Sequence, residues 1–218
     1  MKLFGYWHSS ATWRVRIAMA LKEISYDYEP VNLLNADHLK QNYIKRNPQG
    51  LVPSLETDDG QVLTQSLAII QYLDQRFPST PLVSSDPVKA AQINAIAIMI
   101  ASEAQPFGNL RVLNYLQKEL HLDEDQIKAW MNRFVTSTLE AVERLLPDQG
   151  EGQNPNFAFD NRPGLAEIFI IPQCYAARRR GAKIDHLKKL VSIEKKCENH
   201  PAFIKAHPST QPDNPANS

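Results

Sequence analysis

The stretch Tyr6-Trp7-His8-Ser9-Ser10-Ala11-Thr12-Trp13-Arg14-Val15-Arg16-Ile17-Ala18 joins a short apolar run, residues 2–7, to a helical run, residues 12–21. A strand that breaks at Ser9 and Ser10 and turns into a helix brings hydroxyls and backbone N–H groups to one point. The first N–H groups of a helix have no partner within it, and the helix dipole adds partial positive charge there. This pattern is typical of a site for an anion, including a thiolate, although a serine here also serves as an ordinary helix N-cap.

The composition is that of an ordinary globular protein. The chain has 218 residues, of which 43% are hydrophobic, which is enough for one large domain or two small ones. Its 24 lysines and arginines balance 24 aspartates and glutamates, so the net charge is zero. Without a positive excess there is no electrostatic reason to expect a nucleic acid or an anionic membrane as a partner.

The two cysteines, Cys174 and Cys197, have no metal-binding spacing such as C-x-x-C and do not indicate a secreted disulfide scaffold. We expect no metal site. The N-terminus lacks the basic and apolar regions of a signal peptide, and no stretch reaches the roughly 18 apolar residues of a membrane span. A cytoplasmic protein is therefore expected.

The first part of the chain is predicted to form an α/β unit, because two strands joined by a helix make a βαβ crossover with parallel pairing. The expected elements, in order, are a strand at 2–7, a helix at 12–21, a strand at 26–33, a weak helix at 36–43, a turn at 47–50, a hairpin of strands at 51–56 and 62–64, and a helix from an N-cap at Ser66 to about Phe77.

The pattern changes after Phe77. Three prolines and several serines in residues 78–87 predict a linker. The expected elements beyond it are helices at 88–105, 110–120, 124–146, 165–180 and 187–199, a polar loop at 147–161, and a loosely held or disordered tail from His207. We therefore predict a small α/β domain at residues 1–80, followed by an all-helical domain at 88–218.

Several motifs, in this order, resemble the cytosolic glutathione transferases, and within them the zeta class, which includes maleylacetoacetate isomerase. Besides the stretch from Ser9 to Ala18, the resemblance rests on Asn47-Pro48-Gln49-Gly50-Leu51-Val52-Pro53, Gln65-Ser66-Leu67-Ala68-Ile69-Ile70, Gln105-Pro106 with Asn109-Leu110, Pro172-Gln173, and His207-Pro208 with Gln211-Pro212-Asp213. It implies a thioredoxin-like first domain, a helical second domain, and glutathione as the cofactor.

The resemblance implies that the serine turn is the catalytic point. Ser9, Ser10 and the backbone N–H groups that begin at Ala11 would face the glutathione sulfur. Hydrogen bonds to a thiolate favour the charged form and lower the pKa of the thiol. The best-known form of the zeta motif has cysteine where this chain has Ala11. No thiol can act there, but the hydroxyls and backbone donors remain.

Two further contacts with glutathione are implied in the first domain. Val52 and Pro53 resemble a cis-proline turn that exposes the Val52 backbone to the cysteinyl part of glutathione, in the manner of an added strand. An ordinary proline at a strand edge is the alternative. Gln65 and Ser66 begin a helix whose N–H groups would take the γ-glutamyl carboxylate, while Ser66 also serves as a cap.

The helical domain would supply the rest of the site. Gln105 and Asn109 match positions that reach glutathione from that side. The oxygens of a maleyl keto acid call for cations, for which Arg179 is the first candidate and Arg14 and Arg111 are weaker ones.

The activity implied by the resemblance is glutathione-dependent cis–trans isomerisation of maleylacetoacetate to fumarylacetoacetate, a step of tyrosine and phenylalanine catabolism, by a homodimer. Maleylpyruvate isomerase is the nearest alternative. A general glutathione transferase that acts on small electrophiles such as α-halo acids is a second. A non-catalytic binding protein with the same fold is a third.

Overall fold

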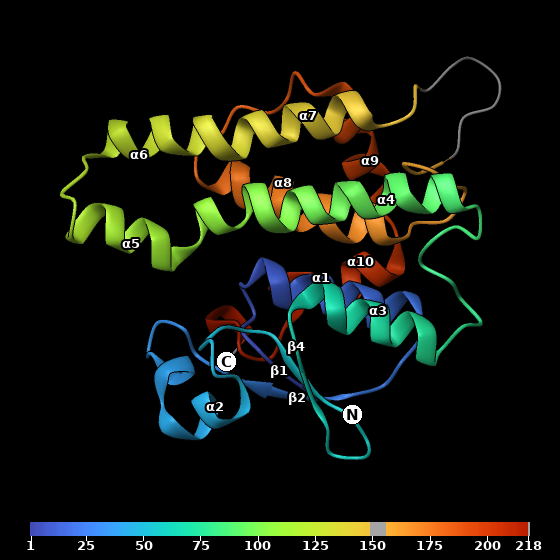
Figure 1. Cartoon of the computed structure of the whole chain (residues 1–218), viewed down its shortest axis with the longest axis horizontal. Helices are drawn as coiled ribbons and strands as arrows, with labels where there is room; N and C mark the ends of the chain where they lie inside the picture. The colour runs from blue at the N-terminus through green and yellow to red at the C-terminus, as the bar shows by residue number, and fades with distance from the viewer. Residues whose placement is uncertain (149–155, 218) are drawn as a thin grey trace. The chain divides into compact units, whose positions relative to one another are not determined.

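The computed structural model describes residues 1–148 and 156–217 and divides the chain into two compact units (Figure 1). The first unit contains Met1–Leu82 and Asn199–Ser218, and the second contains Val83–Glu198. The predicted combination of an α/β part and a helical part is confirmed. Among the described residues, no helix combines the length and apolar character that crossing a bilayer requires.

A four-stranded sheet forms the centre of the first unit, in the order β2-β1-β3-β4. Its strands are β1 (Lys2–Gly5), β2 (Asp27–Pro30), β3 (Ser54–Glu56) and β4 (Val62–Thr64). β1 and β2 are parallel, as the βαβ pattern predicts, whereas β3 pairs antiparallel with both β1 and β4. The sheet is therefore mixed, because the short β3–β4 connection allows only antiparallel pairing.

The helices of the first unit are α1 (Ser10–Leu21), α2 (Gln41–Arg46), α3 (Ser66–Arg76) and α10 (Pro201–Ala206). α1 packs against both α3 and α10 (Figure 1). Its residues from Ala11 to Met19 are all buried, so it is a core helix rather than an amphipathic one. The weak helix expected at 36–43 is instead a 3₁₀ turn, Asp37–Leu39, followed by α2.

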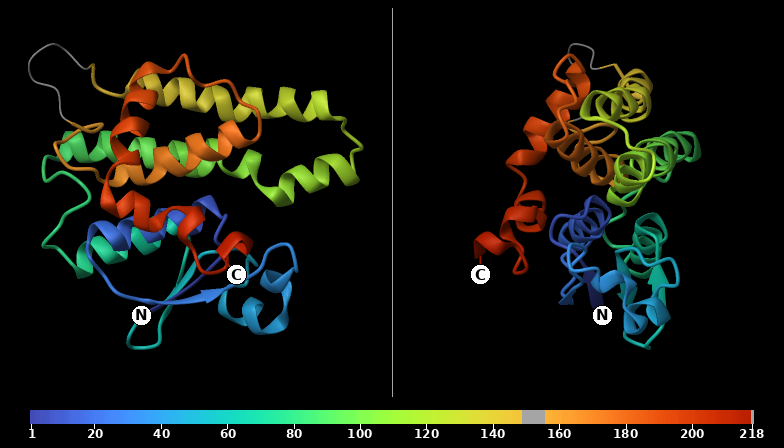
Figure 2. Two further views of the ribbon diagram at one scale, coloured as in Figure 1. Left: turned by 180° about the vertical axis from the view of Figure 1, so that it is seen from behind. Right: turned by 90° about the vertical axis from the view of Figure 1, so that its left-hand side faces the viewer.

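The C-terminal segment differs from prediction. Residues expected at the end of the helical domain belong to the first unit, where α10 lies against α1 (Figure 2). The tail beyond His207 is not loose: it forms 3₁₀ turns at Pro208–Thr210 and Pro215–Asn217. Buried Gln211 donates from Nε2 to the carbonyl oxygens of Lys205 and His207. Prolines exclude regular helix here, but side-chain hydrogen bonds satisfy the backbone instead.

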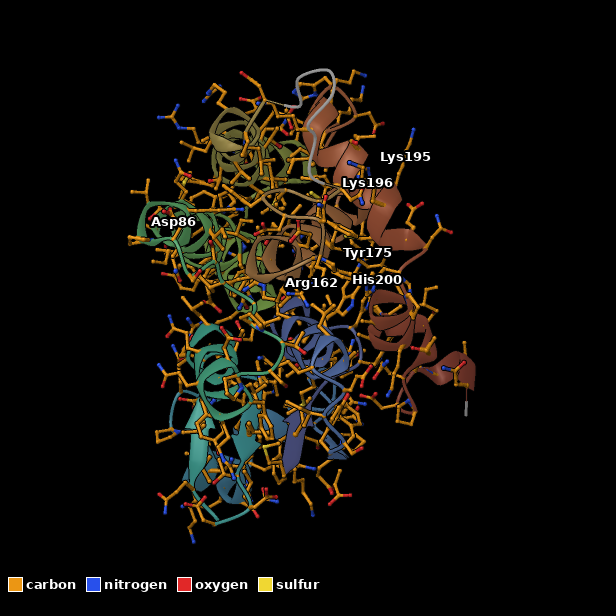
Figure 3. The ribbon with its side chains drawn as sticks, turned by 90° about the vertical axis from the view of Figure 1, so that its right-hand side faces the viewer. Asp86, Arg162, Tyr175, Lys195, Lys196 and His200 are labelled. Carbon is orange, nitrogen blue, oxygen red and sulfur yellow. The ribbon has the colours of Figure 1, made fainter. Side chains whose placement is uncertain are left out.

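The second unit is built around α8 (Leu165–Arg179), which contacts α4 (Pro87–Met99) and α9 (Lys188–Glu198). The remaining helices are α5 (Leu110–Lys118), α6 (Glu124–Met131) and α7 (Ser137–Leu145). Ile168, Phe169 and Ile170 of α8 have no exposed surface. Figure 3 labels Lys195 and Lys196, which belong to the α9 sequence.

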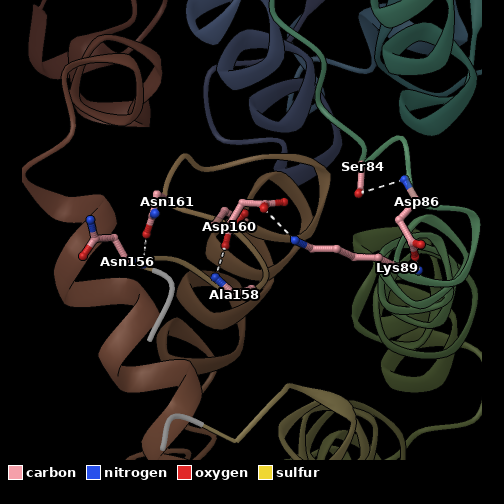
Figure 4. A network of polar contacts seen from close by, with 8 residues as sticks. Ser84, Asp86, Lys89, Asn156, Ala158, Asp160 and Asn161 are labelled. Atoms are coloured by element: carbon pink, nitrogen blue, oxygen red, sulfur yellow. Dashed lines mark hydrogen bonds and ion pairs between the residues drawn. The ribbon is translucent and has the colours of Figure 1, made fainter. Parts of the chain in front are cut away.

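An ion pair joins α4 to the segment before α8 (Figure 4). Asp86 caps α4 by accepting the Lys89 N–H at 2.7 Å, and the Lys89 ammonium lies 2.6 Å from the Asp160 carboxylate. The predicted loop at 147–161 is irregular where it is described, and its residues 149–155 lie outside the described part of the chain. The Glu167 carboxylate accepts a hydrogen bond from the Gly164 N–H at 2.8 Å. This is one of the two hydrogen bonds of a capping box; the other needs a side-chain oxygen, which glycine lacks.

Candidate functional site

The register of the sheet brings three predicted contact points to one end of the first unit. Phe4 of β1 is paired with Ser54 of β3, and Ser54 is paired with Thr64 of β4. The serine turn follows β1, the Val52–Pro53 pair precedes β3, and Gln65 follows β4. Neighbouring strands lie about 4.8 Å apart, so the three points span roughly 10 Å across the sheet. This spacing suits an extended tripeptide.

The serine turn combines a structural cap with donors that remain available. Ser9 is the N-cap of α1, and its Oγ accepts the Thr12 N–H at 3.2 Å. The Ser9 N–H donates to the Tyr6 carbonyl at 3.0 Å, which closes the turn. Ser10 is the first residue of the helix, and both serines are half-buried. The cap therefore holds Ser9 Oγ in place through its lone pair and leaves its proton to donate to an anion.

The second contact point is a loop that buried polar groups hold in one shape. The Val52–Pro53 bond is cis, as the resemblance implies. Buried Asn47 donates from Nδ2 to the Leu51 carbonyl at 2.6 Å, and the Tyr43 hydroxyl donates to the same oxygen at 2.8 Å. In the described part of the chain, the Val52 N–H and C=O make no hydrogen bond to the backbone. Its N–H and C=O are therefore available to pair with an extended ligand.

The third contact point differs from prediction in one detail. Gln65, not Ser66, is the N-cap of α3, and Ser66 is the first helical residue. Gln65 has φ +69°, a conformation that L-residues rarely adopt and that is enriched at ligand-binding sites. Its Nε2 donates to Gln49 Oε1 at 2.7 Å. Ser66 is no cap, because the turn after β4 places the preceding residue at the helix boundary.

Gln49 lies beside the start of α3, although the sequence predicted it only as part of a turn. Its side chain is exposed and is joined to Gln65, and its N–H donates to Asn47 Oδ1 at 3.2 Å. The motif Asn47-Pro48-Gln49-Gly50 carries the signal, since Gly50 has φ +62° and Asn47 organises the loop. A composition-based turn prediction does not reveal that this side chain faces the start of α3.

The remaining predicted residues stay predictions as ligands. In the second unit, Gln105 ends a π-helical segment, Asn109 caps α5 by accepting the Arg111 N–H, and Arg111 is exposed. Arg179 is the exposed last residue of α8. In the first unit, Arg14 is fully buried in α1, and burial lowers its pKa to about 9.

Neither cysteine lies at the serine turn, and both are buried in the second unit. Burial raises the pKa of the Cys174 and Cys197 thiols. A raised pKa suppresses the thiolate, which is the reactive form. Throughout residues 1–148 and 156–217, no group of three metal-ligating side chains is found.

Comparison with known proteins agrees with this geometry. Residues 3–81 match the family described as glutathione S-transferase, N-terminal domain. The chain is 42% identical to a maleylacetoacetate isomerase of Pseudomonas aeruginosa over 218 residues, which cover 99% of this chain and 100% of the relative.

Solved structures give the same result. A bacterial zeta-class maleylpyruvate isomerase in its holo form has a TM-score of 0.92 and 34% identity, covering 98% of this chain and 100% of the other. A maleylacetoacetate isomerase of Anaeromyxobacter dehalogenans with glutathione bound in its active site has a TM-score of 0.85 and 34% identity, covering 98% and 97%. With its serine turn, cis-proline loop and full-length similarity, the chain belongs to the zeta class of the glutathione transferases.

Proposed function

We propose that this protein is a maleylacetoacetate isomerase, which converts the cis double bond of a maleyl keto acid to the trans form with glutathione as cofactor. The observation that carries the proposal is the convergence of Ser9, Val52 and Ser66 at one end of the sheet. The similarity to the Pseudomonas aeruginosa isomerase over the whole chain supports the choice of substrate.

The residues present fit glutathione at each of its parts. The N–H groups at the start of α3 suit the γ-glutamyl carboxylate, because a helix N-terminus offers donors and partial positive charge. The Val52 backbone suits the cysteinyl peptide, because nothing else in the described chain occupies it. The Ser9 hydroxyl and the first N–H groups of α1 suit a thiolate. Glutathione bound in this way supplies a thiolate that adds reversibly to the double bond, which permits rotation.

The protein's own part in the reaction is to lower the pKa of the thiol, orient it, and balance negative charge on the substrate. Ser9 would donate a hydrogen bond to the sulfur of bound glutathione, while the Thr12 N–H holds the Ser9 Oγ in place. A cation is needed where charge develops on the keto oxygen, and preorganised charges of this kind supply large rate effects. Arg179 is our first candidate for that role, with Arg14 and Arg111 as weaker ones, and Gln105 and Asn109 are proposed to contact glutathione.

The test is the rate of cis–trans isomerisation of maleylacetoacetate and maleylpyruvate, measured side by side with and without glutathione. We expect fast turnover of maleylacetoacetate only with glutathione. Equal rates without it would refute the mechanism. Preference for maleylpyruvate would select the alternative, which the TM-score of 0.92 to a maleylpyruvate isomerase favours. Glutathione binding without turnover of either maleyl acid would leave two alternatives, a transferase that acts on α-halo acids and a non-catalytic binding protein. An assay with an α-halo acid distinguishes them.

The homodimer and the cytoplasmic location stay predictions. Sedimentation equilibrium of the purified chain tests the first: a mass near 24.7 kDa contradicts a dimer, and twice that mass supports it. Fractionation of the source cells tests the second.

A further inference from the structure

The C-terminal tail reaches the serine turn through one carboxylate. Asp213 Oδ2 accepts a hydrogen bond from the Trp7 N–H at 2.8 Å and another from the Tyr28 hydroxyl at 3.1 Å. Trp7 lies two positions before Ser9, in the turn that leads from β1 to α1. The motif Gln211-Pro212-Asp213 thus contacts the turn that carries Ser9 and Ser10.

Arg16 holds the other backbone polar group of Trp7. Its Nη2 donates to the Trp7 carbonyl at 2.9 Å, and its Nε donates to the Ala206 carbonyl, at the end of α10, at 3.0 Å. Trp7 is therefore held at its N–H by the tail and at its C=O by α1. Burial lowers the pKa of the Arg16 guanidinium, and the negative charge of nearby Asp213 opposes that shift.

The tail that presents Asp213 is itself rigid. Gln211 and Asn214 on either side are 6% and 7% exposed. Asn217 Nδ2 donates to the Ser209 carbonyl at 2.7 Å and to the Gln211 carbonyl at 2.9 Å. These contacts fix the position of the Asp213 carboxylate. Its charge-assisted hydrogen bond with the Trp7 N–H therefore constrains the turn before α1.

Trp7 and Ser9 belong to the same short turn, so fixing the Trp7 backbone also restricts Ser9. The Trp7 and His8 rings stack with centroids 4.3 Å apart, and the Ser9 N–H returns to the Tyr6 carbonyl at 3.0 Å. A shift of the Trp7 peptide would therefore move the residue that caps α1. We propose that Asp213 is a positioning residue, which holds the Ser9 hydroxyl in the geometry that stabilises the glutathione thiolate. This inference rests on the proposed binding of glutathione at the serine turn, but it does not depend on which substrate is isomerised.

The proposal predicts a change in the sulfur's environment with little change in the affinity for the rest of glutathione. The variant is Asp213→Asn, which keeps the size of the side chain and removes its charge. We expect the pKa of the bound glutathione thiol to rise by about 0.5 to 1 unit, and kcat to fall by about threefold to tenfold. The KM for glutathione and the binding of S-methylglutathione should stay within about twofold, because Val52 and Ser66 hold the peptide part.

The thiol pKa is read from the ultraviolet absorbance of the bound thiolate, with no isomerisation substrate present. Failure of the wild type to bind glutathione would contradict the proposed function, whereas normal binding with an unchanged thiol pKa in Asp213→Asn would overturn this inference alone. Circular dichroism and urea unfolding confirm that each variant is folded.

Three more variants separate positioning from a general effect. Asp27→Asn removes an exposed carboxylate from β2 of the same unit and should leave the thiol pKa unchanged. Tyr28→Phe removes the second donor to Asp213 but keeps the Trp7 hydrogen bond, so it should cause the smaller shift. Asp213→Glu, which keeps the charge on a longer side chain, should restore part of the effect and serves as the test if Asp213→Asn does not fold. An equal shift in Asp27→Asn and Asp213→Asn would refute a specific role.

Discussion

Phe4 and Ser54 stand directly opposite each other in the antiparallel pair of β1 and β3. β4 continues this register, with Thr64 beside Ser54. The serine turn, the cis-proline loop and the start of α3 therefore lie at the same end of the sheet. A slip of one residue would turn the side chains of β3 to the other face of the sheet and would expose buried Leu55. The packing of the core therefore fixes the spacing of the site.

The close approach of β1 to α1 predicts a specific steric effect. A Cβ built on Gly5 would lie 2.2 Å from Thr12 Cγ2. Gly5→Ala should lower the free energy of unfolding by about 1–3 kcal/mol, as overpacked core positions do. Thr12→Ser removes the clashing methyl and keeps the hydroxyl that accepts the Tyr6 N–H. In urea unfolding, the double variant should recover most of the loss relative to Thr12→Ser; additive effects would contradict the contact.

The two serines should differ in what their loss does. Ser9 caps α1, so Ser9→Ala should cost about 1 kcal/mol of stability in addition to its effect on the reaction. Because we assign the thiolate hydrogen bond to Ser9, kcat should fall by about 100-fold. Ser10→Ala should leave stability nearly unchanged and lower kcat less.

Urea unfolding and steady-state kinetics with glutathione check both serine variants. The control is Ser9→Thr, which retains the capping oxygen and should keep the stability. A larger loss of kcat in Ser10→Ala would transfer the role to Ser10.

Two substitutions at Gln65, whose backbone is strained, should affect stability differently but glutathione binding equally. Gln65 has φ +69°, which glycine adopts freely, so Gln65→Gly should raise the free energy of unfolding by about 0.5–1 kcal/mol. Gln65→Ala loses the same side chain but keeps the strain, and should show no such gain. Both variants lose the hydrogen bond to Gln49 and should bind glutathione more weakly to a similar extent. Calorimetry measures the affinity, and a stabilised Gln65→Ala would argue against strain.

Three histidines predict how stability depends on pH. Burial lowers the pKa of His38, His200 and His207, and nearby Arg16 lowers that of His207 further. Between the folded pKa and the ordinary value near 6.5, the unfolded chain binds more protons than the folded chain. The contribution of these histidines to the free energy of unfolding is therefore fully present above pH ~6.5, and it is lost as the pH drops through their folded pKa values.

Urea midpoints measured between about pH 8 and about pH 5 test this dependence. His207 Nδ1 accepts the Ser209 N–H at 3.1 Å, a hydrogen bond that protonation would break. His207→Gln should therefore reduce the pH dependence, whereas His121→Gln, at an exposed position, should leave it unchanged. A wild type whose stability rises on acidification would contradict the direction.

The helix start at Ser9, the parallel pairing of β1 with β2 and the turn at residues 47–50 depend on residues close in sequence, and the sequence predicts them. A cap, a βαβ crossover and a glycine with positive φ are recognisable because their energetics are local. The boundary at Gln65 was predicted one residue late because its conformation is strained, and local propensity disfavours it. The glutathione contacts were predicted from the family resemblance. Local patterns alone do not decide whether Ser9 and Ser66 cap a helix or bind a ligand.

By itself the sequence determined the α/β and helical parts of the chain, the serine turn and the family, because each rests on short patterns or on motifs in order. Only the tertiary structure decided that residues 199–218 complete the first unit and that Asp213 accepts the N–H of Trp7, 206 positions away. The proline-rich tail carries no helical or strand periodicity that could predict this. Its order comes from side chains such as Gln211 and Asp213, which satisfy backbone groups that only the folded chain brings near.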